Sequence, residues 1–226
     1  MINWQGVFGV LRAAFRPELL QPRLVIPDIR SLDSLALRRH GFTGIVIDKD
    51  NCITMPHHDE LLPELSQAWR ELLDTFGPAS VLIVSNSAGT VDDPGLIQAE
   101  SVSRTLGVPV LVHARKKPGC ARDVEQYFLG HADQTVARVV DVAQSRLGAS
   151  QLAPPRLAVI GDRVLTDTVL ANRLHSLNAV GILTTRVWTR ESLGTRFMRS
   201  MEMLALRALR TRNDADLLVC LLPHAR

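Results

Sequence analysis

The fold of this chain is decided by residues 44–52, GIVIDKDNC, where a short apolar run leads directly into two carboxylates. The apolar residues at 44–47 predict a buried strand. Asp48 and Asp50 stand one residue apart, and alternation along an extended chain sends both side chains the same way. Two carboxylates this close repel each other unless a cation shares their site. The stretch therefore predicts a carboxylate nucleophile beside a carboxylic acid/base, together with a hard divalent metal ion.

The bulk composition is that of one globular domain. The chain has 226 residues, of which 46% are hydrophobic and 22% charged, which is enough apolar sequence for a core. Its net charge of +3 and aromatic content of 4% are not those of a dedicated nucleic-acid binder. Cys52, Cys120 and Cys220 show no metal-binding spacing, which argues against a zinc site and against a disulfide scaffold. No apolar run approaches the roughly 20 residues that cross a bilayer.

Residues 1–22 form a segment of their own. Apolar residues recur there at near-helical spacing, with Arg12 and Arg16 between them and no acidic residue before Glu18. The pattern is typical of a helix that lies on a membrane surface, and also of an organelle-targeting segment. A helix packed on the core is the third alternative. The sequence therefore predicts a membrane-contacting or targeting segment at 1–22, a core at 23–190 and a basic helical extension at 191–226.

Short apolar runs alternate with helical patterns through the core. Val, Ile and Leu fill both faces of these runs, as in parallel strands that are covered by helices on both sides. The alternation predicts an α/β fold with a doubly wound parallel sheet. The predicted strands are residues 44–47, 81–84, 108–112, 157–160 and 180–183, and the predicted helices are residues 60–76, 95–106, 120–128, 135–147 and 166–174.

Polar side chains follow the predicted strands at the point where each strand ends. Ser85 and Asn86 follow the second strand, Lys117 follows the third, and Asp162 and Asp167 follow the fourth. Ligands of doubly wound sheets bind beyond the carboxyl ends of the strands. We therefore expect these groups to meet the two carboxylates of the first strand at one edge of the sheet.

Taken in order, these groups resemble the four motifs of the haloacid dehalogenase superfamily of phosphohydrolases. The motifs correspond to residues 48–50, to Ser85, to Lys117 before Pro118, and to residues 161–167. Lys116 is the alternative to Lys117, and the adjacent proline favours Lys117. The resemblance covers roughly residues 44–185 and implies a Rossmann-like core. Predicted core elements fill the spans between the motifs, so no large cap domain is expected.

A narrower resemblance is to the mitochondrial phosphatidylglycerophosphate phosphatases of fungi and their bacterial relatives. It rests on residues 48–51 (DKDN), 85–89 (SNSAG), 92–94 (DDP), 116–119 (KKPG) and 161–167 (GDRVLTD). Members of that family remove the terminal phosphate of phosphatidylglycerophosphate, giving phosphatidylglycerol for cardiolipin synthesis. Cys52 departs from the family, whose first motif usually ends in Thr, and a thiol forms weaker hydrogen bonds than a hydroxyl.

The resemblance implies a catalytic or binding role for five residues. Asp48 would attack phosphorus and form an aspartyl-phosphate, and Asp50 would act first as the acid and then as the base. Ser85 and Asn86 would bind the phosphoryl group of the substrate. Lys117 would contact the substrate and offset charge on the aspartyl-phosphate as a point cation.

The resemblance also implies a Mg²⁺ ion. Its ligands would be Asp48, the backbone carbonyl of Asp50, and Asp162. Asp167 would lie behind these ligands and orient Lys117 or a metal-bound water. Without the ion, the negative charge of a phosphoryl group would repel an attacking carboxylate.

An uncapped site suits a substrate presented at a surface, such as a lipid headgroup. Residues 196–210 form a basic amphipathic pattern that would dock on an anionic membrane, and the plainer alternative is a terminal helix packed on the core. We therefore expect a peripheral phosphatidylglycerophosphatase on the matrix side of the mitochondrial inner membrane. Two alternatives stay open: an uncapped phosphatase of soluble phosphomonoesters or of a phosphorylated macromolecule, and a membrane-bound adaptor without activity. Oligomeric state is not readable from the sequence.

Overall fold

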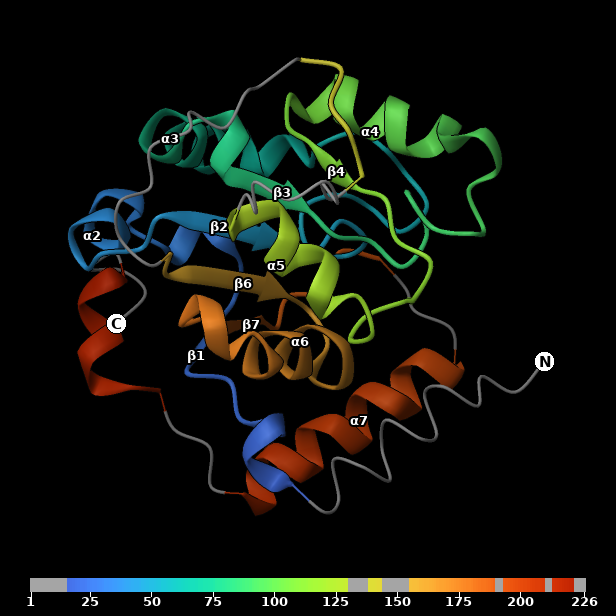
Figure 1. Cartoon of the computed structure of the whole chain (residues 1–226). Helices are drawn as coiled ribbons and strands as arrows, with labels where there is room; N and C mark the ends of the chain where they lie inside the picture. Colours follow the sequence, from blue (N-terminus) through green and yellow to red (C-terminus); the bar gives the residue numbers. More distant parts are fainter. Residues whose placement is uncertain (1–15, 130–137, 144–154, 190–192, 210–212, 222–226) are drawn as a thin grey trace.

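The computed structural model describes residues 16–129, 138–143, 155–189, 193–209 and 213–221. In this part of the chain one sheet lies between two layers of helices (Figure 1). The strand order is β1-β7-β6-β2-β3-β4-β5, with β5 antiparallel to β4 and the other pairs parallel. The strands are β1 (Leu24–Ile26), β2 (Gly44–Ile47), β3 (Val81–Ile83), β4 (Val110–Leu111), β5 (Val139–Val140), β6 (Leu157–Gly161) and β7 (Val180–Thr184).

Helices and short helical turns connect these strands. The α-helices are α2 (Ser34–Arg39), α3 (Ser66–Phe76), α4 (Ile97–Leu106), α5 (Ala121–Leu129), α6 (Val169–Arg173) and α7 (Leu193–Ala208). The shorter turns are η1 (Pro17–Leu20), η2 (Ile29–Ser31), η3 (Pro63–Leu65), η4 (Pro78–Ser80), η5 (Pro94–Leu96), η6 (Val164–Thr168), η7 (His175–Leu177) and η8 (Ala215–Cys220). Four of these turns begin with a proline. Proline is favoured there because the first N–H groups of a helix have no acceptor within the helix, so the N–H that proline lacks costs no hydrogen bond.

The two faces of the sheet are covered by different helices. Alternation along β2 sends Ile45 and Ile47 to one face and Val46 to the other. Ile45 and Ile47 belong to the core cluster that contains the buried residues of α2, α3 and α4. Val46 belongs to the cluster beneath α5 and α6. Because both faces are covered, β2 is buried along its whole length, which explains why it is apolar on both sides.

The chain changes direction across the sheet at β2. From β2 it moves outward through β3 and β4 on one side, and it later returns through β6 and β7 on the other. β2 and β6 are parallel neighbours, with Ile47 opposite Ile160. Ligands of doubly wound sheets bind beyond the carboxyl ends of the strands at such a point. The segments that follow β2 and β6 are therefore the place where a site is expected to form.

The predicted fold class is confirmed. The five predicted strands correspond to β2, β3, β4, β6 and β7, with ends that shift by one or two residues. β1 and α2 were not predicted from the sequence. β1 pairs in parallel with β7, with Leu24 opposite Ile182. Its three residues lie between Pro22 and Pro27, and so short a run has no periodicity of its own.

The prediction of a helix over residues 135–147 is wrong where the structure describes this segment. Val139 and Val140 form β5, which pairs antiparallel with β4. Two consecutive β-branched residues favour the extended backbone, and the open edge of β4 supplies their hydrogen-bond partners. Residues 135–137 and 144–147 lie outside the described residues.

Two further predicted helices begin later than expected. The helix predicted over 60–76 begins at Ser66, after the turn η3. The helix predicted over 95–106 begins at Ile97, because Leu96 has a left-handed backbone with a φ of 60°. The remaining two predicted helices correspond to α5 and to η6 followed by α6.

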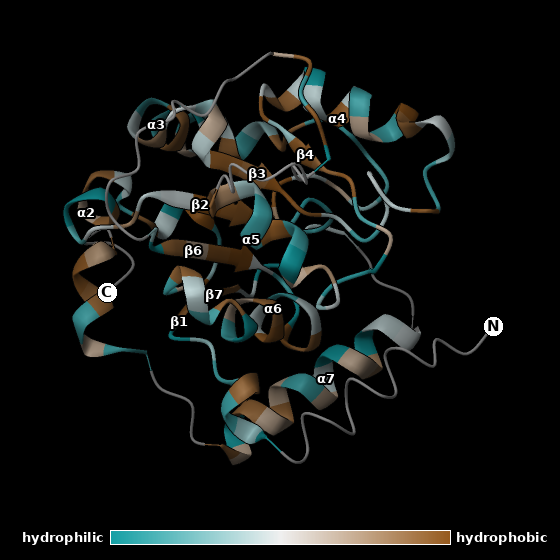
Figure 2. Cartoon of the chain, viewed as in Figure 1, coloured by the Kyte–Doolittle hydropathy of each residue, from teal (hydrophilic) through white to brown (hydrophobic). Residues whose placement is uncertain are grey.

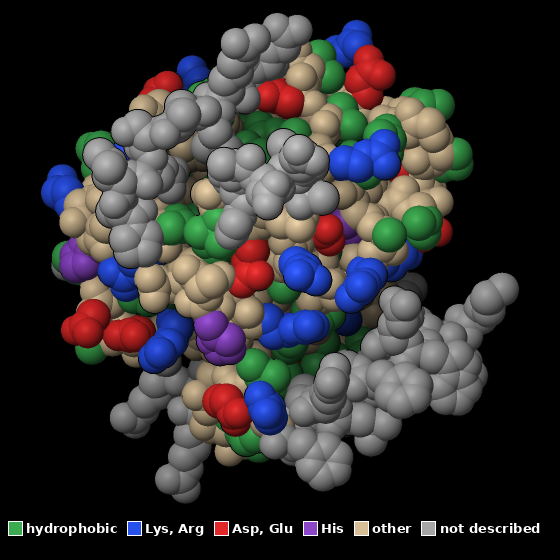
Figure 3. Space-filling model, in the orientation of Figure 1, with side chains coloured by type: hydrophobic (Ala, Val, Ile, Leu, Met, Phe, Trp, Pro, Cys, Tyr) green, Lys and Arg blue, Asp and Glu red, His purple; other side chains and the backbone are tan. Residues whose placement is uncertain are grey.

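No large cap domain interrupts the described part of the core. Between Asp48 and Ser85 the chain forms a loop, η3, α3, η4 and β3, and between Ser85 and Lys117 it forms η5, α4 and β4. In the space-filling view, acidic and basic side chains are interspersed over the face shown (Figure 3). None of the helices in the described ranges has the length and apolar character needed to cross a membrane.

The carboxyl-terminal extension packs on the core. Leu206 of α7 is buried in a cluster with Leu20 and Val164. Leu217 and Cys220 of η8 and the following Leu221 are buried in the cluster beneath α2 and α3. Residues 1–15 lie outside the described residues, so the membrane or targeting role of residues 1–22 stays a prediction. The division of the chain at residues 22 and 190 stays a prediction as well.

Candidate active site

A buried chain of charges joins three of the predicted residues. Asp48 follows β2, Lys117 lies in the loop after β4, and Asp167 lies in η6 after β6. The ammonium nitrogen of Lys117 lies 2.7 Å from an oxygen of Asp48 and 2.7 Å from an oxygen of Asp167. The side chain of Lys117 is only 2% exposed, so both ion pairs are removed from water. The ammonium is thus placed to offset negative charge on any group that Asp48 carries.

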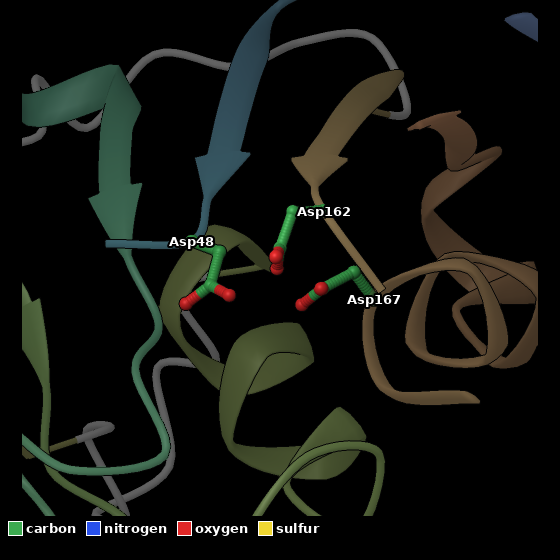
Figure 4. Close-up of side chains that lie close together, drawn as sticks. All are labelled: Asp48, Asp162 and Asp167. Atoms are coloured by element: carbon green, nitrogen blue, oxygen red, sulfur yellow. The ribbon is translucent and has the colours of Figure 1, made fainter. Parts of the chain in front are cut away.

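Asp162 completes a group of three buried carboxylates. It follows β6, and its side chain lies close to those of Asp48 and Asp167 (Figure 4). One ligand oxygen of each carboxylate lies within 4.8 Å of the others. Gly161 permits this approach, because a Cβ atom at that position would lie 2.2 Å from Cγ of Asp167. A larger residue at 161 would displace Asp167 from the group.

Burial and crowding change the proton affinities of these groups. Burial, opposed by Lys117 and reinforced by Asp167 and Asp162, raises the pKa of Asp48 to about 8. Burial and the neighbouring Asp167 also raise the pKa of Asp162. Against the opposing effect of burial, Asp167 and Asp48 raise the pKa of Lys117. The group therefore favours a further positive charge beside its carboxylates.

The donor set fits a hard divalent cation such as Mg²⁺. The three side chains offer only oxygen ligands, and all three are buried. Asp48 and Asp162 belong both to this group and to the predicted metal ligands. Asp167, predicted to lie behind the ligands, stands among these oxygens and also accepts a hydrogen bond from Lys117. The prediction for Asp50 concerns its backbone carbonyl, and it stays a prediction.

The carboxylate of Asp50 faces other partners. The ammonium of Lys49 and the backbone N–H of His57 each donate to its Oδ1 at 2.8 Å. The hydroxyl of Ser87 donates to its Oδ2 at 3.0 Å. Burial opposes the effect of these bonds, but together they lower the pKa of Asp50, with Lys49 contributing most. Asp50 is therefore ionised in this structure and held in one orientation.

Ser87 and Asn86, as well as Ser85, connect the second motif to the site. Ser85 is fully buried, and its hydroxyl lies 3.0 Å from that of Ser87, which in turn bonds Asp50. Asn86 lines the cavity described below, and its Oδ1 accepts a hydrogen bond of 2.7 Å from the backbone N–H of Lys117. The loop after β3 is thereby tied to the loop that carries the lysine.

Two residues that the sequence analysis missed hold Asp162 in place. Asn51 Nδ2 donates to Oδ2 of Asp162 at 2.9 Å. Arg199 donates to the same oxygen at 2.6 Å and to the backbone carbonyl of Asp162 at 2.9 Å. Asn51 lies inside the first motif, so its position was a usable signal. Arg199 lies in α7, and nothing in its local sequence marks it as a site residue.

Lys49, Ser87 and His113 were missed as well. Lys49 is fully buried, and besides Asp50 it donates to the carbonyl of His58 at 2.8 Å. The two ring nitrogens of His113 lie 2.7 Å from the carbonyl oxygen of Arg115 and 2.9 Å from that of Ser85. His113 thus joins the loops after β3 and β4. Lys49 and Ser87 lie inside the first and second motifs, so their positions were usable signals, whereas His113 had none.

Cys52 is a buried thiol. Its Sγ accepts a hydrogen bond from the hydroxyl of Thr184 at 3.9 Å. Burial, together with the nearby charges of Asp48 and Asp162, raises the pKa of Cys52 well above its usual value. A thiol that stays protonated is a poor nucleophile. The side chain therefore packs behind the carboxylates. The resemblance described above would place Thr at this position.

A cavity of about 770 Å³ opens onto this group. Its size is that of pockets that accept small molecules or headgroups. One wall comes from the loop after β2 and the other from α7. The lining includes Asp48, Asp50, Asp162, Asn86, Met55, His57, His58, Arg163, Thr195, Met198 and Glu202.

The fold and the site together define an α/β protein with a carboxylate and lysine centre at the switch point of its sheet. The oxygen ligands of such a site fit a hard cation, and its position beyond the strand ends is where doubly wound sheets bind their ligands. The family model described as mitochondrial PGP phosphatase, where PGP is phosphatidylglycerophosphate, matches residues 4–187. The chain belongs to this family, which is a family of phosphoric monoester hydrolases. The resemblance to the mitochondrial phosphatidylglycerophosphate phosphatases is thereby confirmed.

Curated relatives carry matching names. The chain is 33% identical over 193 residues to the mitochondrial phosphatidylglycerophosphatase of Saccharomyces cerevisiae, which covers 85% of this chain and 89% of that protein. It is 29% identical over 225 residues to a probable mitochondrial phosphatidylglycerophosphatase of Schizosaccharomyces pombe, covering 94% and 95%. It is 38% identical over 167 residues to the chloroplastic phosphatidylglycerophosphate phosphatase 1 of Chlamydomonas reinhardtii, covering 73% of this chain and 53% of that protein. The chain thus spans about half of the algal protein. No solved structure matches the chain.

Proposed function

We propose that this protein is a Mg²⁺-dependent phosphatidylglycerophosphatase, which hydrolyses the terminal phosphate of its lipid substrate and yields phosphatidylglycerol for cardiolipin synthesis. The observation that carries the proposal is the buried pairing of Lys117 with Asp48 and Asp167, beside Asp162. A nucleophilic carboxylate, a fixed cation and oxygen ligands for a metal are what phosphoryl transfer to water requires. The substrate, phosphatidylglycerophosphate, is proposed from the names of the relatives.

In this mechanism Asp48 is the nucleophile. Its carboxylate attacks phosphorus and expels the glycerol oxygen, and water then hydrolyses the aspartyl-phosphate. Lys117, which lies 2.7 Å from Asp48, offsets the charge of that intermediate, and Asp167 holds Lys117 in place. Asp48, Asp162 and the backbone carbonyl of Asp50 would hold a Mg²⁺ ion, which would further neutralise the charge of the phosphoryl oxygens.

Asp50 is the proposed acid and base. As the acid it protonates the departing glycerol oxygen, and as the base it takes a proton from the hydrolytic water. The anionic substrate brings a like charge next to Asp50, which raises the pKa of this carboxyl toward that of a proton donor. Lys49 and Ser87 keep the carboxylate in one orientation during both steps. Ser85 and Asn86 complete the proposed phosphoryl-binding loop.

The proposed location is the matrix side of the mitochondrial inner membrane, with the protein bound peripherally to an anionic surface. Both yeast relatives are named mitochondrial. The cavity has no large cap over it in the described part of the chain, so it suits a headgroup that stays at a bilayer surface. The acyl chains then remain in the membrane.

The direct test is phosphate release from phosphatidylglycerophosphate in detergent micelles. We expect release with Mg²⁺, a loss of at least about 100-fold in EDTA, and recovery when excess Mg²⁺ is added back. Sugar phosphates and glycerol 3-phosphate are assayed in parallel. Turnover of these soluble esters without the lipid would make the protein a phosphatase of soluble substrates. Mg²⁺ binding with no turnover of any ester would favour a catalytically silent adaptor.

Arg199→Met is expected to lower the free energy of unfolding of the metal-free protein by about 2 kcal/mol, because Asp162 loses hydrogen bonds from a charged donor. Thermal unfolding should show a drop in Tm of roughly 4–8 °C. If Asp162 binds the ion, saturating Mg²⁺ should reduce the difference in Tm between the wild type and Arg199→Met. Arg196→Met, in the same helix and exposed, is the matched control. Equal Tm values for the two variants would remove Arg199 from the site.

A further inference from the structure

We propose that the outward face of α7 is the surface by which this protein docks on an anionic lipid bilayer, and that docking sets the cavity against the headgroup. The outward face consists of Phe197, Met201 and Leu204, bordered by Arg196 and Arg207. The inference rests on the proposed function in one respect, which is that the substrate is a lipid.

The outward face is apolar although it lies in solvent. Phe197 is 65% exposed, Met201 is 50% exposed and Leu204 is 60% exposed. Steps of four and then three residues place these side chains on one side of the helix. Figure 2 shows hydrophobic and hydrophilic residues alternating along α7. A helix that merely covers a core usually turns polar residues to the solvent, so this stripe calls for a partner.

The opposite face of α7 is already committed to the core. Leu206 is buried and Met203 packs against the same cluster. Glu202 is buried, and its carboxylate accepts a hydrogen bond from Nε of Arg163 at 3.1 Å. The helix is therefore fixed to the protein by one side. It presents the other side, with its apolar stripe, as a preformed surface.

The charges beside the stripe indicate which partner it meets. Arg196 and Arg207 are exposed, and helical geometry places both on the same flank of the apolar residues. Arginines beside an apolar stripe are typical of helices that lie in the interface of an anionic bilayer. A second copy of this chain is a less suitable partner, because an isologous contact through the stripe would gather the arginines of both copies.

The position of α7 connects docking with the site. Thr195 and Met198 line the cavity, and Arg199 donates to the carboxylate of Asp162 at 2.6 Å. Met198 and, on the other wall, Met55 are both exposed at the cavity lining. A phosphate at the end of a lipid headgroup stays near the bilayer surface, so the cavity that accepts it has to open onto that surface. The outward face lies on the same helix as Thr195 and Met198 of the cavity lining, so docking of that face would bring the cavity close to the bilayer.

The test is flotation of the full-length protein with vesicles, without substrate. The vesicles are phosphatidylcholine alone or phosphatidylcholine with about one fifth phosphatidylglycerol, a fraction that gives a negative surface potential. We expect the wild type to float with the anionic vesicles. The triple variant Phe197→Ser, Met201→Ser, Leu204→Ser should bind at least about tenfold more weakly, because it loses the buried apolar area. Arg196→Glu with Arg207→Glu should also weaken binding and reduce its salt dependence.

Matched controls separate this surface from general effects. Ile97→Ser removes an apolar side chain that is 74% exposed on α4, and Arg70→Glu reverses an exposed charge on α3. Both should float like the wild type. All substituted positions are exposed, so the Tm should stay close to that of the wild type. As an independent measurement, the fluorescence of Met201→Trp should shift to the blue and be quenched by brominated lipid, while that of Ile97→Trp should not.

The outcomes that overturn the proposal are specific. Full flotation of the triple variant would do so. So would loss of flotation on deletion of residues 1–15 with no effect of the triple variant, because binding would then belong to that segment. If the triple variant differed from the wild type in native mass but not in flotation, the outward face would be a protein interface. Flotation that depends on α7 in a protein that hydrolyses no lipid would retain the docking surface and remove the proposed function. Lipid hydrolysis by a protein whose flotation does not depend on α7 would retain the proposed function and remove the docking surface.

Discussion

Asp48→Asn is expected to abolish phosphate release, with a loss on the order of 10⁴-fold or more, as when the nucleophile of a covalent mechanism is removed. The amide keeps the shape of the carboxylate but cannot attack phosphorus. The fold should survive, because the loss of one ion pair with Lys117 is offset by the removal of a buried charge. The change in Tm should then stay within about 4 °C, the shift produced by about 1 kcal/mol in a domain of this size.

The intermediate provides a second measurement of the same residue. Acid quenching during turnover of labelled lipid should trap phosphate on the wild-type protein and none on Asp48→Asn. Asp74→Asn, which alters an exposed carboxylate on α3, is the control and should match the wild type in both assays. Activity of Asp48→Asn within about tenfold of the wild type would assign the nucleophile to another group.

Lys117→Met is expected to give the largest loss of stability. The lysine lies between two buried carboxylates at 2.7 Å from each, so the variant leaves Asp48 and Asp167 without their common counter-charge. Breaking buried pairs in this way costs roughly 3–5 kcal/mol. The Tm of the metal-free protein should fall by roughly 6–20 °C, and phosphate release should be lost. Burial raises the pKa of Asp48, so its ionised form is the unfavourable one, and the penalty should be largest at high pH and shrink as the pH falls.

Lys116→Met is the neighbouring control. Its side chain is 39% exposed and pairs with Asp92 at the surface. Such a pair contributes at most about 1 kcal/mol, so thermal unfolding should show little change. A Tm for Lys117→Met equal to that of Lys116→Met would show that the buried pairs contribute nothing to folding. Phosphate release that is lost in Lys116→Met and retained in Lys117→Met would make Lys116 the functional cation, which is the alternative that the sequence left open.

The sequence predicted the central strands and the edge at which the charged groups meet. Residues 44–47 are apolar on both faces, and that property alone requires cover on both sides and a place in the middle of the sheet. The carboxylates, the serine and the lysine follow strand ends, and parallel strands bring their carboxyl ends together. β5 was misread as a helix because two valines carry no clear period, and the edge of β4 decided their conformation.

The choice of partners within the site was decided by the tertiary structure. Ser87 rather than Ser85 bonds Asp50, because the turn after β3 directs the later hydroxyl toward the first motif. Arg199 reaches Asp162 only because α7 packs back across the sheet edge, 37 residues further along the chain. A local pattern records which face of a strand or helix is buried. It holds no information on which remote side chain lies at hydrogen-bond distance, since that depends on how separate elements pack.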